Sequence, residues 1–152
     1  MKNIQLPLDQ ILVLKEHLEE VIDIEIKIAD LASKTSGIMQ KYILSTGKAA
    51  GDIRYRLIWA MKGQMSLRRT LGIMSSRMTV HDSSSAIMKI VPNASSAEDA
   101  DVLEALADLQ NQVVQKRRAV YMELLLMAAA NAPDVPWFKK QFDRLSHTAA
   151  AA

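Results

Sequence analysis

The sequence predicts an α+β fold, in which long N- and C-terminal helices pack on a small antiparallel β-meander or hairpin. Three observations carry this prediction: helical spacing of apolar residues near both ends, strand-like alternation over residues 53–73, and four of the five glycines between positions 47 and 72. Apolar residues three and four apart indicate a helix, whereas a period of two indicates a half-buried strand. Two long helices are therefore expected to flank a central sheet.

The central alternation predicts two strands joined by a three-residue turn. Large apolar residues occupy every second position of 53–61, and they recur at Met65, Leu67, Leu71 and Ile73 after Lys62-Gly63-Gln64. Such a turn needs one residue with positive φ, and Gly63 is the natural candidate. Residues 39–45 are expected to add a first strand to this hairpin.

An all-α helical bundle is the alternative for the same segment. Apolar residues over positions 50–78 also fit a heptad, although Gly51, Gly63 and Gly72 would each cost up to about 1 kcal/mol against alanine inside a helix. The β-prone residues Ile53 and Tyr55 favour strands instead. The heptad positions are Ala50, Ile53, Leu57, Ala60, Leu67, Leu71, Met74 and Met78.

The flanking segments predict one domain, 1–148, with 149–152 as a frayed tail or a cloning scar. A first helix is expected from Leu8 to about Ser33, because Pro7 suits a helix start and Gly37 suits a stop. Residues 75–96 predict a connection with an ordered patch at 86–91. A serine cap then begins a helix to about residue 130, and a short helix follows at 136–145. The apolar positions of the first helix are Ile11, Leu14, Leu18, Val21, Ile22, Ile28 and Leu31.

Charge is nearly balanced overall but is distributed unevenly. The net charge is +2, yet residues 41–92 hold nine basic and two acidic side chains, whereas residues 1–40 hold four basic and seven acidic ones. Such asymmetry favours an anionic partner for the middle segment, although neutralisation within the fold explains it equally well. On the predicted hairpin Arg54, Arg56 and Arg68 would share the face opposite the apolar one, with Lys62 at the tip and Lys48 at the other end. The candidate nucleic-acid-binding residues are Arg54, Arg56, Lys62, Arg68 and Lys48.

The sequence contains no recognisable catalytic, cofactor or metal motif. The three histidines lie far apart, and the chain has no cysteine, which excludes disulfides and thiolate metal sites. No apolar run is long enough to span a bilayer. We therefore expect a cytoplasmic protein that is not an enzyme, needs no cofactor or metal and does not bind a membrane.

The central motifs resemble those of small uncharacterised proteins of integrating conjugative elements and plasmids. The residues concerned are Thr46-Gly47, Arg54-Tyr55-Arg56, Lys62-Gly63-Gln64, Arg68-Arg69 and Leu103-Glu104-Ala105-Leu106. The resemblance covers about residues 44–130. It implies the context of a bacterial mobile genetic element, such as a plasmid or a conjugation system, but no settled activity.

Two functions follow from these expectations. The first is a non-enzymatic, nucleic-acid-binding accessory protein of a mobile element, which contacts phosphates of DNA or RNA with a basic hairpin. The second is a helical structural or adaptor protein, whose long helices bind a protein partner or self-associate as a homo-oligomer.

Overall fold

In the ranges that it describes, residues 4–83 and 97–151, the computed structural model is built from helices alone. The predicted α+β fold with a β-meander or hairpin is therefore wrong, and the all-α bundle is the correct alternative. The helices are α1 (Leu8–Ser33), α2 (Gly37–Lys62), α3 (Leu67–Ser83), α4 (Ala97–Asn131) and α5 (Pro136–Ala151).

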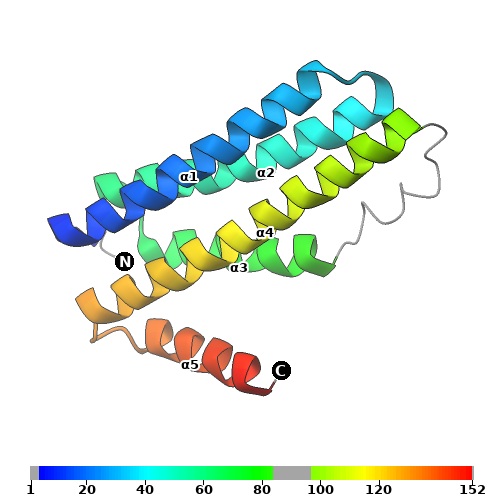
Figure 1. The fold of residues 1–152 in the computed structure, drawn as a ribbon. Helices are drawn as coiled ribbons and strands as arrows, with labels where there is room; N and C mark the ends of the chain where they lie inside the picture. The colour runs from blue at the N-terminus through cyan, green and yellow to red at the C-terminus, as the bar shows by residue number, and fades with distance from the viewer. Residues whose placement is uncertain (1–3, 84–96, 152) are drawn as a thin grey trace.

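The long helix α4 holds the bundle together. It packs against each of α1, α2, α3 and α5, and α1 and α2 also pack extensively against each other. Figure 1 shows α1 and α2 running side by side in the upper part of the molecule, α4 crossing the centre, and α3 and α5 below it. The protein thus has two helical layers that share α4.

The first predicted helix is confirmed at both ends. Pro7 lies in extended backbone directly before α1, and its carbonyl accepts hydrogen bonds from the backbone N–H groups of Gln10 and Ile11. Its buried residues lie at helical spacing: Leu14, Val21, Ile24, Ile28 and Ala32. Gly37 does not stop this helix, because α1 ends at Ser33 and Gly37 is the first residue of α2.

The predicted strands at 39–45 and 53–61 both lie within the single helix α2. Ile53, Leu57 and Ala60, which are four and three residues apart, are each at most 2% exposed. Tyr55, which a hairpin would place on the same apolar face, is 43% exposed. The strand prediction is wrong because apolar residues of this segment also recur three and four positions apart. A helix buries those residues and leaves the other large side chains at the border of its buried face.

Gly63 has the predicted positive φ, but it ends a helix instead of turning a hairpin. Its φ is 64°, and the N–H groups of Gly63 and Gln64 donate to the carbonyls of Ala60 and Trp59. This pattern is a Schellman C-cap, which favours glycine at the left-handed position. The chain then begins α3, so Trp59 and Leu67 are not paired across strands.

The C-terminal half largely follows the predicted order. Helix α4 ends at Asn131, one residue beyond the expected end, and α5 begins at Pro136 as expected but continues to Ala151. The predicted connection over 75–96 is wrong up to Ser83, because α3 includes these residues. The ordered patch at 86–91 and the serine cap lie outside the described residues.

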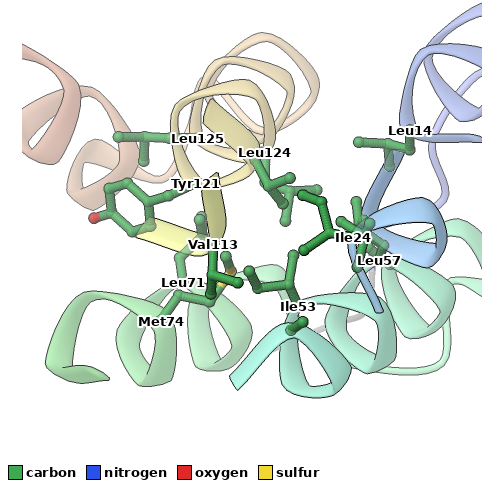
Figure 2. Packing of buried hydrophobic residues seen from close by; sticks show 14 of the residues in the cluster. Leu14, Ile24, Ile53, Leu57, Leu71, Met74, Val113, Tyr121, Leu124 and Leu125 are labelled. Atoms are coloured by element: carbon green, nitrogen blue, oxygen red, sulfur yellow. The ribbon is translucent and has the colours of Figure 1, made fainter. Parts of the chain in front are cut away.

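The core lies between the two layers, where all the helices contribute apolar side chains. Figure 2 shows Leu14 and Ile24 of α1 and Ile53 and Leu57 of α2 facing Leu124 of α4. On the other side of α4, Leu71 and Met74 of α3 pack near Tyr121, which is 2% exposed. Burial raises the pKa of the Tyr121 hydroxyl above its ordinary value, because a charged phenolate is disfavoured away from water.

Gly63→Val is expected to lower the free energy of unfolding by about 1–2 kcal/mol, because a β-branched residue is strained at positive φ. A Cβ at this position would also meet the side chain of Gln5. Gly72→Ala is the matched control: Gly72 lies inside α3 with open space around it, so alanine should add up to about 1 kcal/mol. Urea denaturation of both variants measures the difference, and equal stability would contradict the capping role.

Candidate functional site

The predicted basic face does not exist as one surface, because two of its arginines bind acids within the bundle. Arg54 points from α2 toward α1, where its Nε donates to Glu25 Oε1 over 2.7 Å. Arg56 is only 8% exposed, and its Nη2 lies 3.5 Å from Asp52 Oδ1. Both guanidinium groups are therefore held by intramolecular carboxylates instead of facing phosphates.

Arg56 is a buried structural cation. Its guanidinium lies 5.2 Å from the centre of the Tyr55 ring, Nη1 lies 3.5 Å from the sulfur of Met65, and Nε is buried without a hydrogen-bond partner. Asp52 also binds Arg77 of α3, with Oδ1 3.3 Å from Nη1. The carboxylate of Asp52 thus joins a buried and a half-exposed arginine at the contact between α2 and α3.

Arg68 lies in a different part of the molecule from the other predicted residues. It lies in the first turn of α3, and its guanidinium lies 5.4 Å from the centre of the Trp137 ring on α5. A cation over an aromatic face at this distance is held by the ring quadrupole. This contact links α3 to α5, so Arg68 serves packing there.

Lys48 and Lys62 are the two predicted residues that the structure brings to one exposed face. Together with Lys41 and Tyr55 they form a series on α2 in which each residue is seven positions from the next, and all four are exposed. Residues seven apart lie on nearly the same side of an α-helix. We call these four residues the α2 lysine face. In the described part of the chain, none of its lysines forms an ion pair.

Sequence reasoning missed Lys41 and Tyr55 because it placed them on separate strands. The seven-residue spacing of 41, 48, 55 and 62 was the available signal, and it has meaning only once the segment is assigned as one helix.

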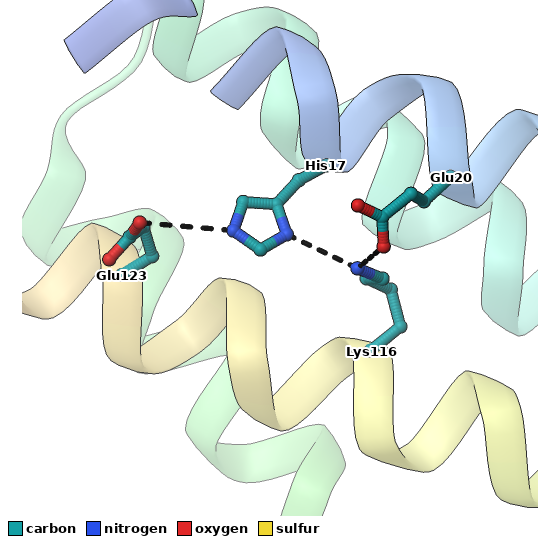
Figure 3. A network of polar contacts seen from close by, with 4 residues as sticks. All are labelled: His17, Glu20, Lys116 and Glu123. Carbon is teal, nitrogen blue, oxygen red and sulfur yellow. Dashed lines mark hydrogen bonds and ion pairs between the residues drawn. The ribbon is translucent and has the colours of Figure 1, made fainter. Parts of the chain in front are cut away.

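A polar network between α1 and α4 was also missed. Figure 3 shows Lys116 of α4 between His17 and Glu20 of α1, with Glu123 on the far side of the imidazole. Lys116 Nζ lies 3.3 Å from His17 Nδ1 and forms a short ion pair with Glu20, and His17 Nε2 lies 3.9 Å from Glu123 Oε1. His17 and Lys116 are 99 residues apart, so no local motif could reveal this contact.

Lys116 of α4 contacts two side chains of α1 in this network, His17 and Glu20. An ammonium can only donate, so in a hydrogen bond between Lys116 and His17 the ring nitrogen Nδ1 is the acceptor. The hydrogen bond from Lys116 lowers the pKa of Glu20 below its ordinary value. The Lys116 side chain is 13% exposed, so its terminal amine contacts Glu20 and His17 of α1 more than bulk water.

The network borders a shallow surface depression of about 460 Å³, lined by Glu20, Ile24, Gln112, Gln115, Lys116 and Ala119. None of the lining residues is a serine, threonine or cysteine nucleophile, and the Lys116 side chain is paired with Glu20. Among the described residues, no three histidine, aspartate or glutamate side chains gather as metal ligands would. The arrangement is best explained as a clasp that fixes α1 on α4.

Comparisons with protein-family models, with curated proteins and with solved structures find no match to this chain. Among the helices that the structure describes, none has the length and apolar character needed to cross a bilayer. The α2 lysine face therefore remains the candidate functional site on its own geometry.

Proposed function

We propose that the protein is a non-enzymatic accessory protein that binds nucleic acid through the phosphates, using the α2 lysine face. The observation that carries this proposal is the alignment of Lys41, Lys48 and Lys62 along one exposed side of α2, with Tyr55 between them. Lysine ammonium groups that are not engaged by carboxylates are free to replace the counterions of a phosphate backbone. Tyr55 adds a ring on which a base can stack.

The proposed surface replaces the predicted arginine set by a lysine set. Arg54 and Arg56 contribute positive potential behind the lysines, but their guanidinium groups are already bound to Glu25 and Asp52. Lys41 and Lys62 are 21 residues apart, which corresponds to about 31 Å along a helix. Contacts spread over this length suit sequence-independent binding along a backbone better than recognition of a base. The mobile-element context that the sequence resemblance implies belongs to the same proposal.

Replacing Lys41, Lys48 and Lys62 together by glutamine is expected to weaken nucleic-acid binding and leave the fold intact, because all three are exposed. The slope of log K against log salt should fall by about two to three units if each lysine neutralises one phosphate. Fluorescence anisotropy with labelled duplex DNA and single-stranded RNA, at two salt concentrations, measures both effects.

The matched control is the triple replacement of Lys34, Lys139 and Lys140 by glutamine. These lysines are also exposed, and their loss changes the net charge equally, but they lie outside α2. If both triple variants weakened nucleic-acid binding equally, net charge alone would explain the loss. The binding surface would then not be on α2. Absence of binding by the parent protein would contradict the proposed function.

The alternative function, a helical structural or adaptor protein, is favoured by a different observation. Helix α1 carries four large apolar side chains on its outer side that are between 40% and 71% exposed: Leu8, Leu12, Ile22 and Ile26.

A further inference from the structure

The outer side of α1 carries a stripe of residues with coiled-coil spacing. Leu8 is 71% exposed, Leu12 52%, Ile22 40% and Ile26 61%, so the four form an uncovered apolar surface. Figure 1 shows α1 along the upper edge of the molecule, with the rest of the bundle below it. Lys15 and Glu19 occupy the middle of the stripe, whose spacing alternates between four and three residues as in a heptad seam. We call these six residues the α1 stripe.

The α1 stripe is complementary to a reversed copy of itself. Counting inward from its two ends, Leu8 corresponds to Ile26, Leu12 to Ile22, and Lys15 to Glu19. In an antiparallel pair of helices, each position meets the position counted from the opposite end, and a heptad a residue faces a d residue. A second α1 in this orientation would therefore meet each apolar residue with an apolar one and each charge with its opposite.

We propose that a second copy of this chain docks on the α1 stripe, with the two α1 helices antiparallel about a two-fold axis on the outer side of α1, at the level of residue 17 along the helix. The inference deepens the adaptor alternative by naming its partner, and it does not depend on phosphate binding by α2. An isologous contact of this kind closes after two subunits, as in most homodimers. Leu8 and Leu12 of one protomer would pack on Ile26 and Ile22 of its partner, and Lys15 would bind the partner's Glu19.

Charge selects the antiparallel orientation over the parallel one. A parallel pair would place Lys15 against Lys15 and Glu19 against Glu19, and like charges in contact are destabilising. Within one chain Lys15 Nζ and Glu19 Oε1 are already 4.0 Å apart, with both side chains more than half exposed. The two protomers could therefore form a four-charge cluster from two existing ion pairs without burying an unpaired charge.

One margin of the stripe opposes association. Three acidic residues lie along one side of the stripe: Asp9, Glu16 and Asp23. Asp23 forms an ion pair with Lys27, with Oδ2 3.4 Å from Nζ. Glu16 lies one residue from the centre of the stripe, so in an antiparallel pair it would approach Glu16 of the partner. Glu16→Gln is therefore expected to tighten the dimer.

The first test is sedimentation velocity of the full chain over a concentration series. We expect the parent to shift from monomer to dimer, and Ile26→Ser to weaken the dimer at least about tenfold, because each change acts twice across the axis. Ile38→Ser is the matched control, since Ile38 is 65% exposed on α2, outside the stripe. Circular dichroism checks that both variants stay folded. A parent that remains monomeric, or equal weakening by the two variants, would overturn the proposal.

The second test uses charge reversal at Lys15 and Glu19. Lys15→Glu and Glu19→Lys should each abolish the homodimer, because either change gives positions 15 and 19 the same charge, so that they repel across the interface. Mixing the two variants should form a heterodimer, and the double variant Lys15→Glu/Glu19→Lys should regain the homodimer. A parallel dimer would not respond to either single change, since its central charges already repel. Single reversals without effect would therefore overturn the antiparallel arrangement. Anisotropy with labelled DNA on the same samples reports the proposed function separately.

Discussion

Leu57→Ala is expected to lower the free energy of unfolding by about 2–5 kcal/mol, because it removes a leucine side chain from the closed centre of the core. Leu57 is 0% exposed and lies on α2 where this helix faces α1 and α4. The cavity cannot be filled easily, since the residues around it belong to helices fixed by other contacts. Urea denaturation followed by circular dichroism measures the change.

Leu44→Ala is the matched control for this prediction. It is the same substitution on the same helix, but Leu44 is 50% exposed. Exposed positions without special contacts change stability by only about 0.5 kcal/mol. If both variants lost the same stability, the side of α2 that faces the core would be assigned wrongly.

Asp52→Asn is expected to cost about 3 kcal/mol, because it leaves the Arg56 guanidinium buried without a countercharge. The Asp52 and Arg56 side chains are 14% and 9% exposed, so water cannot readily replace the lost carboxylate. The amide would also leave Arg77 without its ion-pair partner at 3.3 Å, although that side chain is 45% exposed and loses little.

A double-mutant cycle separates the loss of this pair from a general disturbance of α2. Arg56→Met removes the buried charge and keeps a long apolar side chain, so it should change stability much less than Asp52→Asn. In the Arg56→Met background, Asp52→Asn should cost far less than in the parent. Additive effects would mean that the two residues do not interact, and that the buried arginine is neutralised elsewhere.

The elements predicted correctly are those in which the local sequence signals favour a helix over a strand. Helix α1 was predicted correctly although the isoleucines of 22–28 also alternate as in a strand, because Pro7 precedes it and no turn signal interrupts it. The helix from residue 97 begins with acids and continues without glycine or proline. The spacing in the middle segment fits both a strand and a helix, because Ile53 and Leu57 lie on one face of a strand and are also one turn apart in a helix. What decides between them is the surface on which the segment packs, formed mainly by α1 and in part by the sequence-distant α4, and the apolar period of the segment does not reveal it.

The candidate site was predictable only in part for the same reason. Lys48 and Lys62 are exposed as expected, but Arg54 binds Glu25 from another helix, 29 residues away in sequence. The pairing of Arg56 with Asp52, four residues earlier, would have been visible from the helical spacing alone. Helical spacing groups Ile22 with the other apolar residues of the first helix, whereas the structure leaves it 40% exposed as part of the α1 stripe.

The central position of α4 has a consequence for how the chain emerges during synthesis. Helices α1 and α2 leave the ribosome before the helix that covers their apolar sides has been made. At translation rates of about 5–20 residues per second, this interval lasts several seconds. During that time Leu14 and Leu57 can be shielded only by the pairing of α1 with α2 or by a chaperone. A nascent chain that stalls before α4 would thus expose the surfaces that the finished protein hides most completely.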